Sequence, residues 1–203
     1  MDYKINSIFY SIQGEGHWTG TPAVFIRMAN CNRKCGFCDA EYEEWFRFNA
    51  SNLVHNTIQL APPICKHIVI TGGEPFLQDL RPLIKEFTQR DFHKTIHIET
   101  NGDLLPVYQE MDRLVALNNL WITYSPKEIH RDYKCVDEIK LVYTGDVRIM
   151  QHLEEVYGCD DDSPWLFLQP CDGMDNVQEV VNIVKERPWW RLSLQTHKLI
   201  GIK

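Results

Sequence analysis

The stretch "KHIVITGGEPFLQDLRPLIKEFTQR" at residues 66–90, followed by "KTIHIET" at 94–100, decides the fold. It joins a short apolar run rich in β-branched residues to a longer amphipathic run and then to a second apolar run, which predicts strand, helix and strand. The helix has one apolar stripe, and Asp79 can cap it with Pro82 in its first turn, where the missing N–H costs nothing. The stripe consists of Leu80, Leu83, Ile84 and Phe87. Such a unit predicts parallel strands joined by a right-handed crossover.

The same alternation continues to the end of the chain. A strand "AVFIR" precedes it, and the segment from Asp39 to Pro63 is predicted to be an irregular loop followed by a short helix. Further strands are expected over 120–125, 137–143, 165–170 and 191–196, and further helices over 104–119, 147–158 and 176–188. The pattern predicts an α/β protein with a mostly parallel sheet.

Composition and charge narrow the class of protein. A chain of 203 residues with 44% apolar and 24% charged residues suits a single globular domain. The formal charge of -7 disfavours a broad phosphate-binding surface, so we expect no nucleic-acid partner. The start of the chain has no signal-peptide pattern and no stretch is apolar for about 20 residues, so we expect a soluble cytoplasmic protein without a membrane partner.

Polar motifs follow the predicted strands at their carboxyl ends. They are "TGGEP" at 71–75, "ETNG" at 99–102, "SPK" at 125–127, "QP" at 169–170 and "QTHK" at 195–198. In parallel α/β sheets and barrels, binding sites collect at this edge. The five motifs therefore predict one shared pocket.

Three of the seven cysteines are clustered in "NCNRKCGFCD" at residues 30–39. The odd total argues against a disulfide framework, and no ligand role is expected for Cys65, Cys135, Cys159 and Cys171. The spacing of Cys31, Cys35 and Cys38 lets all three thiolates surround one soft metal centre. Three thiolates would leave one iron of a 4Fe-4S cluster open to an exchangeable ligand. The alternatives are unligated thiols or a zinc site completed by a distant histidine such as His17 or His55.

The cysteine spacing and "TGGEP" together resemble the radical S-adenosylmethionine (SAM) enzymes. The resemblance implies that the open iron binds the amino and carboxylate groups of SAM. Gly72 and Gly73 permit close backbone approach, and Glu74 is expected to offer a carboxylate to the ammonium of the cofactor.

The segment "SIQGEGHWTGTPAVFIR" at residues 11–27 carries the substrate hypothesis. Gln13 and Glu15 lie among glycines and have the amide and carboxylate needed to bind a pterin or guanine edge; the alternative is a glycine-rich turn with a surface acid. Arg27 can clamp a substrate carboxylate, or else form an ordinary ion pair at the end of a strand.

With these motifs in this order, the chain is similar over nearly its whole length to the 7-carboxy-7-deazaguanine synthases. The resemblance implies a radical SAM core, a shortened partial TIM-like barrel of about six parallel strands with crossover helices. It implies one domain over 1–203 with a substrate-binding segment over 1–30. The implied activity is that of a carbon-nitrogen lyase, which converts 6-carboxy-5,6,7,8-tetrahydropterin to 7-carboxy-7-deazaguanine by radical ring contraction with loss of ammonia. This is a step of queuosine and other deazapurine biosynthesis, with the radical generated on the cofactor and no certain catalytic side chain.

The resemblance also implies site residues and partners. The implied substrate contacts are Ile12, Gln13, Gly14, Glu15, Arg27, Thr71, His197 and Lys203, the last through the chain-terminal carboxylate. The implied SAM contacts are Phe37, Asp39, Gly72, Gly73, Glu74, Thr100, Asn101, Ser125, Pro126, Lys127 and Gln169. A reductant such as a flavodoxin or ferredoxin and a homodimer are implied as partners.

One position departs from the family pattern. The family implies Mg²⁺ held by an oxygen-bearing side chain after the Cys-Asp pair, but Ala40 stands there and its methyl group cannot bind a hard cation. The protein ligand of Mg²⁺ is therefore open, with Asp39, Glu41 or only substrate and water as alternatives.

Two rival functions share part of this pattern. An activase that makes a glycyl radical on a partner protein would have the cysteines and "TGGEP" but no need for "QGEG" or Arg27. A non-catalytic zinc or iron-sulfur module would need only the cysteines.

Overall fold

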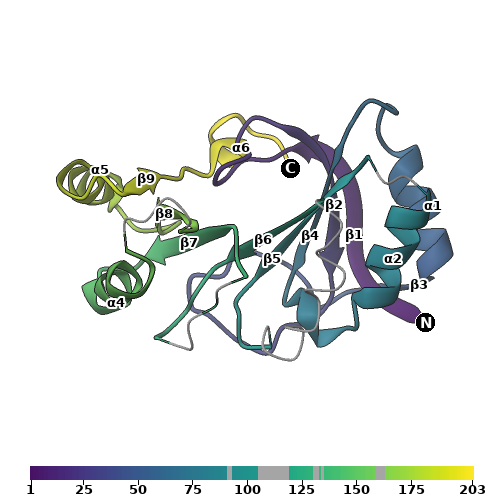
Figure 1. Cartoon of the computed structure of the whole chain (residues 1–203), viewed down its shortest axis with the longest axis horizontal. Coiled ribbons are helices and arrows are strands. Elements are labelled where there is room, and N and C mark those ends of the chain that lie inside the picture. Colours follow the sequence, from purple (N-terminus) through teal and green to yellow (C-terminus); the bar gives the residue numbers. More distant parts are fainter. Residues whose placement is uncertain (91–92, 105–118, 130–132, 134, 159–162) are drawn as a thin grey trace.

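The computed structural model describes residues 1–90, 93–104, 119–129, 133, 135–158 and 163–203, and its described strands form one curved sheet (Figure 1). The order of the nine strands is β3-β1-β2-β4-β5-β6-β7-β8-β9. The strands are β1 (Asp2–Ile12), β2 (Pro22–Met28), β3 (Phe46–Asn49), β4 (His67–Gly72), β5 (Thr95–Thr100), β6 (Leu120–Tyr124), β7 (Glu138–Tyr143), β8 (Trp165–Pro170) and β9 (Trp190–Leu192). The helices are α1 (Ala50–Gln59), α2 (Arg81–Arg90), α4 (Val147–Tyr157), α5 (Val177–Glu186) and α6 (Thr196–Leu199), with a 3-10 turn η1 (Pro75–Leu77).

The predicted parallel α/β sheet is confirmed. From β2 to β9 each neighbouring pair of strands is parallel, while β1 and β3 extend the sheet in antiparallel pairs. The parallel strands are therefore one more than the six expected from the resemblance, because β2 and the short β9 lie at the two ends of the parallel part. The helix expected over 104–119 and the thiol of Cys159 lie outside the described residues.

The core lies between one face of the sheet and the helices. Alternate residues such as Ile68, Ile70, Ile139 and Leu141 point to this face and are at most 2% exposed. The predicted stripe of α2 is buried against it, and the Arg81 backbone N–H donates to the Asp79 carboxylate at 3.1 Å. Because the strands alternate, their other residues face the opposite side, which is where polar side chains gather.

The N-terminal strand β1 was missed from sequence because of a β-bulge. Its pairing with β2 shifts register between Ile5 and Ser7, so Ile5 and Ile8 both contact the main core although they are three residues apart. Phe9 faces the other side and stacks on Phe25 at 5.1 Å between ring centroids. The bulge thus shifts the alternation of buried and exposed side chains in the middle of the strand. Each half of the strand is then too short to be recognised from sequence.

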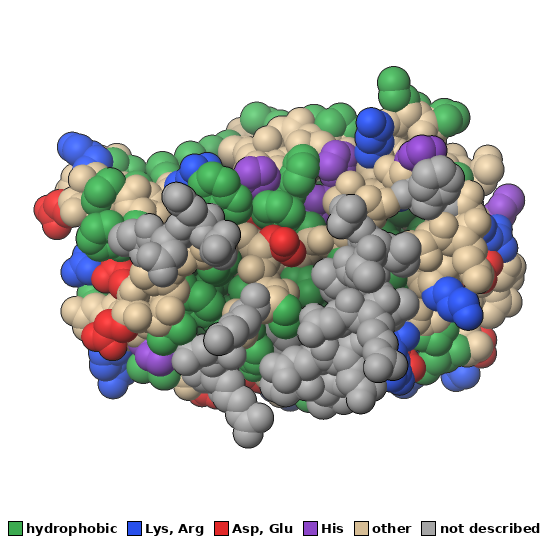
Figure 2. Space-filling model, in the orientation of Figure 1, with side chains coloured by type: hydrophobic (Ala, Val, Ile, Leu, Met, Phe, Trp, Pro, Cys, Tyr) green, Lys and Arg blue, Asp and Glu red, His purple; other side chains and the backbone are tan. Residues whose placement is uncertain are grey.

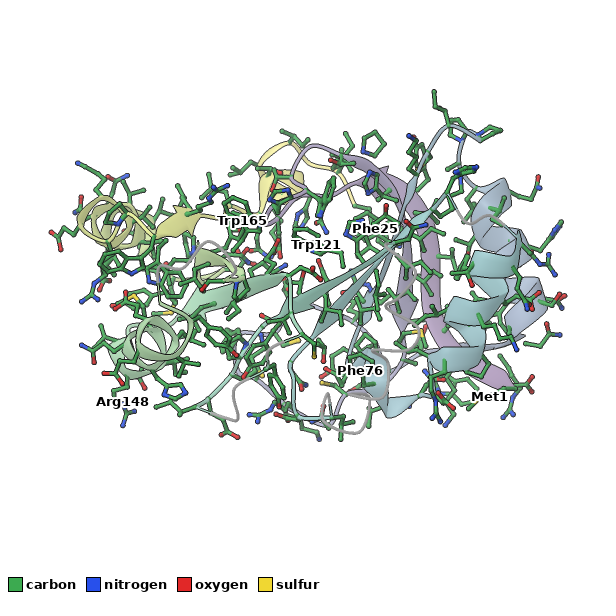
Figure 3. The ribbon with its side chains drawn as sticks, viewed as in Figure 1. Met1, Phe25, Phe76, Trp121, Arg148 and Trp165 are labelled. Atoms are coloured by element: carbon green, nitrogen blue, oxygen red, sulfur yellow. The ribbon has the colours of Figure 1, made fainter. Side chains whose placement is uncertain are left out.

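Aromatic and histidine side chains fill the amino-terminal end of the parallel strands. The His67 Nδ1 and His97 Nε2 atoms lie 2.9 Å apart, and the ring of Trp18 packs on both histidines. His17 packs between Trp121 and Trp165, which lie close together in Figure 3. With this end packed, the polar face of the sheet is open toward the carboxyl ends of the strands.

The surface carries both signs of charge. On the face shown in Figure 2, Lys and Arg side chains lie in small separate groups. In the part of the chain that the structure describes, no helix has the length and apolar character needed to cross a membrane.

Candidate active site

A cavity of about 470 Å³ lies at the carboxyl ends of the strands, where the sequence motifs predicted a shared pocket. Nearly all the predicted site residues line it. From the N-terminal segment and the first strands they are Ile12, Gln13, Gly14, Glu15, Arg27, Thr71, Gly72 and Gly73; from the cysteine loop they are Cys31, Cys35, Phe37, Cys38 and Asp39. From the later strand ends they are Thr100, Asn101, Ser125, Lys127, Gln169, His197 and Lys203.

The three clustered cysteines form one wall of the cavity as free thiols. Burial raises the pKa of the Cys31 thiol, and the nearby Glu74, Cys35 and Cys38 raise it further. Neighbouring thiolates repel one another, so they can ionise together only beside a cationic centre, and an iron-sulfur cluster is such a centre. Among the described residues, no three His, Cys, Asp or Glu side chains are placed to hold a single metal ion.

The glycines of "TGGEP" set the distance between β4 and the cysteine loop. A Cβ atom on Gly73 would lie 1.8 Å from the Asn30 carbonyl oxygen, and one on Gly72 would lie 2.2 Å from that of Met28. The backbone N–H of Gly73 donates to the Met28 carbonyl at 3.2 Å, and that of Glu74 donates to the Asn30 carbonyl at 2.9 Å. Any side chain larger than hydrogen would therefore push the cysteine loop away.

Glu74 does not have the expected place. Its side chain is 0% exposed and does not line the cavity. Its carboxylate accepts from Thr100 Oγ1 at 2.7 Å and from the backbone N–H groups of Asn101 and Phe76 at 2.8 and 3.0 Å. It therefore holds the "ETNG" loop in position instead of facing a cofactor. Pro126 is also buried outside the cavity lining.

The expected SAM side of the cavity includes a small group around Lys127. Its Nζ donates to Ser125 Oγ at 3.0 Å and lies 5.6 Å from the ring centroid of Phe37. Burial lowers the pKa of Lys127. Asn101 adds an amide whose Nδ2 donates to Asn32 Oδ1 at 2.9 Å, beside Cys31.

The floor of the cavity is a buried ionic network that sequence reasoning missed in part. Glu99 accepts from Gln13 Nε2 at 3.0 Å and from Thr71 Oγ1 at 3.0 Å, and the Lys140 ammonium lies 2.5 Å from Glu15 Oε2 and 3.5 Å from Glu99 Oε1. Although burial acts to raise it, the Lys140 ammonium and the Gln195 amide lower the pKa of Glu15. Glu99 and Lys140 line the cavity but were not predicted. The signal available was the alternation along the strand, since Lys140 is a charged residue between Ile139 and Leu141, which face the buried core.

Arg27 lies beside Thr71 at the end of β2 and lines the cavity. Among the described residues, no carboxylate forms an ion pair with its guanidinium, so the alternative of an ordinary strand-end ion pair finds no support there. The guanidinium is available for a carboxylate that enters the cavity.

The C-terminal segment is docked on the N-terminal one and forms the far wall. Thr196 donates from its backbone N–H and its Oγ1 to the Gly14 carbonyl at 3.0 and 2.9 Å. A Cβ atom on Gly14 would lie 2.1 Å from the His197 ring, so the glycine lets this ring approach. Lys203 accepts a hydrogen bond from Ser11 Oγ through its carbonyl oxygen, and its Nζ lies 4.7 Å from the Phe9 ring centroid.

The rim beside the cysteine loop carries charged side chains around Asp39, a predicted SAM contact, and its partners were not singled out from the sequence. Lys198 Nζ donates to Asp39 and, at 2.6 Å, to Asp172 Oδ2. Gln195 Nε2 reaches Asp39 Oδ2 at 3.1 Å and Glu15 Oε1 at 2.9 Å. Although partial burial acts to raise it, the hydrogen bonds from Lys198 and Gln195 lower the pKa of Asp39.

The fold and the three-cysteine cavity define a radical SAM protein, and residues 25–149 match the family model described as the radical SAM superfamily. A 7-carboxy-7-deazaguanine synthase from Bacteroides thetaiotaomicron is 40% identical over 205 residues, with 100% of both chains covered. The chain belongs to the 7-carboxy-7-deazaguanine synthase family.

Other relatives agree with this assignment. The 7-carboxy-7-deazaguanine synthase of Haemophilus influenzae is 31% identical, over 100% of this chain and 95% of that one, and the one from Escherichia coli strain K12 is 30% identical over 100% of both. The crystal structure of QueE from Escherichia coli superposes with a TM-score of 0.73 at 29% identity, over 96% of this chain and 94% of that one. Membership of the radical SAM superfamily implies a 4Fe-4S cluster and SAM as cofactors.

Proposed function

We propose that this chain converts 6-carboxy-5,6,7,8-tetrahydropterin to 7-carboxy-7-deazaguanine by radical ring contraction with loss of ammonia. The observation that carries the proposal is that one cavity brings the three clustered cysteines together with Gln13, Glu15 and Arg27. The names of the full-length relatives support the same reaction.

Cys31, Cys35 and Cys38 would hold the cluster, and the group around Lys127 and Asn101 would hold SAM. When bound, the cluster and SAM supply one electron and a 5'-deoxyadenosyl radical to the cavity. The close packing of Gly72 and Gly73 on the cysteine loop fixes where that chemistry takes place. The protein therefore contributes position and exclusion of water more than acid-base groups.

The proposed substrate contacts fall into two groups, one for the negative carboxylate of the pterin and one for the N–H groups of its ring. Arg27 would clamp the pterin carboxylate, whereas Glu15 and the Gln13 amide would face the N–H groups of the ring. Lys140 and Glu99 hold Glu15, Gln13 and Thr71 in fixed orientations. His197 and the chain terminus at Lys203 would close the pocket from the far side.

The remaining assignments rest on the family resemblance. The chain is a single domain over 1–203 whose first 30 residues include the substrate-binding "QGEG" segment, and it acts as a homodimer reduced by a one-electron donor such as a flavodoxin or ferredoxin. We place it in the cytoplasm, because free thiols and an iron-sulfur cluster with an open corner suit a reducing compartment. Sedimentation of the anaerobic protein tests the dimer.

The decisive experiment is a product assay. Anaerobic, reconstituted protein is incubated with SAM, a reductant and the pterin, and the deazaguanine is measured by mass spectrometry. Cofactor cleavage without this product would favour the activase, and stoichiometric zinc without iron in oxygen-protected protein would favour the non-catalytic module.

Arg27→Ala tests the substrate clamp. The variant should lose pterin turnover by about 100-fold or more while still cleaving SAM slowly, because one charge-assisted bidentate contact is removed from the substrate alone. Arg148→Ala is the matched control, since Arg148 on α4 pairs with the helix-capping Asp146 and lies at the edge of the molecule (Figure 3). Unchanged turnover in the Arg27 variant would contradict the clamp.

A further inference from the structure

The rim of the cavity holds an ammonium group between two carboxylates. Lys198 on α6 donates to Asp39 of the cysteine loop and to Asp172 after β8, and Gln195 donates to the same oxygen of Asp39. These four side chains line the cavity. One lysine therefore joins three segments that are distant in sequence, next to the last cysteine of the cluster motif.

The same place does not suit a magnesium ion. Ala40 lines the cavity beside Asp39 and has no side-chain oxygen. Of the two neighbouring acids in sequence, Glu41 does not line the cavity, and Asp39 already accepts from Lys198 and Gln195. A hard divalent cation needs several oxygen ligands, and here it would have to displace an ammonium group to obtain even one or two.

We infer that the ammonium group of Lys198 takes the place of a divalent cation in this chain, fixing Asp39 at the rim and supplying the positive charge there, so that turnover needs no Mg²⁺. The inference rests on the proposed function. Lys198 is a positioning residue in this scheme: it acts on the SAM side of the cavity through Asp39. Gln195 extends the same arrangement to the substrate side, since its amide also donates to Glu15 at 2.9 Å.

The rim position makes the inference testable by mutation. The Lys198 side chain is 33% exposed and those of Asp39 and Asp172 are 44% and 52% exposed. Ion pairs this exposed contribute little to folding stability, so Lys198→Met should fold and assemble the cluster. Removing the ammonium leaves the carboxylates of Asp39 and Asp172 facing each other across the space that it filled.

The first measurement is binding of Mn²⁺, a paramagnetic ion with the oxygen preference of Mg²⁺, by electron paramagnetic resonance of the reconstituted, oxidised protein. The wild-type protein should bind no stoichiometric Mn²⁺ at the rim. Lys198→Met should bind Mn²⁺ about tenfold more tightly than wild type, and Lys198→Met combined with Asp172→Asn should lose this gain. Stoichiometric Mn²⁺ binding by wild type, or equal binding by all three proteins, would overturn the inference.

The second measurement is turnover after divalent cations are removed with a chelating resin. The wild-type rate should be unchanged by removal or by added Mg²⁺, whereas Lys198→Met should turn over about tenfold more slowly and regain part of the loss with Mg²⁺. Lys185→Met on α5, an exposed lysine that does not line the cavity, is the matched control. A wild-type rate that falls on cation removal and returns with Mg²⁺ would refute the inference. If no protein makes the product, the proposed function fails, and the Mn²⁺ measurement still decides the role of Lys198.

Discussion

At the scale of single residues, Lys140 shows how a charge is kept inside the sheet. Lys140 is 5% exposed, and its ammonium faces Glu15, Glu99 and Glu138. Burial acts to lower its pKa, but these carboxylates outweigh burial and raise the pKa of Lys140, so the group stays charged throughout the working pH range. A buried pair of this kind is costly to break, because the partner left behind remains buried and charged.

Lys140→Met is therefore expected to destabilise the protein by about 3–5 kcal/mol and to abolish pterin turnover, since Glu15 loses its counter-ion. Urea denaturation of the wild type and the variant measures the stability change. Lys140→Arg separates charge from shape: it keeps the charge and should retain more stability than the methionine variant. Equal stability of all three proteins would contradict the role given to the ion pair.

The same residue marks the limit of sequence reading. Residues in loops after strands, such as Gly73, Asn101 and Lys127, were found because short motifs with glycine, proline or amide side chains mark the strand ends. Glu99 and Lys140 lie within strands, and although Glu99 opens the "ETNG" motif, neither was singled out as a site residue. The signal left unused was their alternation with buried neighbours along the strand. Glu74 was found but given the wrong partner, because a motif does not say which way a carboxylate points.

At the scale of elements, local pattern predicted most parallel strands and the helices α1, α2, α4 and α5, but it was poor at the edge of the sheet and near the C-terminus. There, the strand expected over 191–196 is only the three-residue β9, and α6 was not predicted. The loop and short helix expected between Asp39 and Pro63 are present as α1 and the residues before it, with the four-residue β3 unpredicted. Strand β1 was missed because its bulge interrupts the alternation, and β3 because it is short and its side chains are mostly exposed. Central strands are buried on both faces and give continuous apolar runs, whereas edge strands do not.

The histidine pair between β4 and β5 gives a prediction for these elements. Burial, with His67 and His17 nearby, lowers the pKa of His97 to about 3 from an ordinary value of 6.5. The folded state thus keeps the His97 ring neutral, whereas the unfolded chain takes up a proton below pH 6.5. The stabilisation that comes from burying the neutral ring is therefore complete above pH 6.5 and is lost as the pH falls from 6.5 toward 3. Glu138 acts in the opposite direction, because burial raises its pKa to about 7.

The effect of His97 is therefore isolated by comparing variants. Urea denaturation at pH 7.5 and pH 5.5 should show a smaller loss of stability on acidification for His97→Gln than for wild type. His55→Gln on α1, an exposed histidine, serves as the control and should follow wild type. The same loss in all three proteins would show that His97 is not the titrating group.

At the scale of the whole molecule, the cavity is built from both ends of the chain and its middle. Gly16 near the start donates from its backbone N–H to Ser193 Oγ at 3.0 Å, and Ser193 Oγ donates to Gln169 Oε1 at 2.8 Å. The parallel sheet between them supplies the floor and the cysteine wall. The cofactor side thus depends on the central strands, while the expected substrate side also needs the final residues of the chain.

Removing the last three residues, Gly201 to Lys203, separates these two sides. No residue from 196 to 203 is buried, so the shortened chain should fold, bind the usual iron and sulfide, and retain His197 and Lys198. It loses the chain terminus beside Ser11 and Phe9, so the KM for the pterin should rise by about tenfold or more while SAM cleavage continues without product. Leu199→Ala, which changes a side chain 73% exposed in the same segment, should behave as wild type.

Iron analysis and the 5'-deoxyadenosine assay measure the cofactor side, and the deazaguanine assay measures the substrate side. If the shortened chain still made deazaguanine in proportion to 5'-deoxyadenosine, the terminus would not be a wall of the substrate pocket.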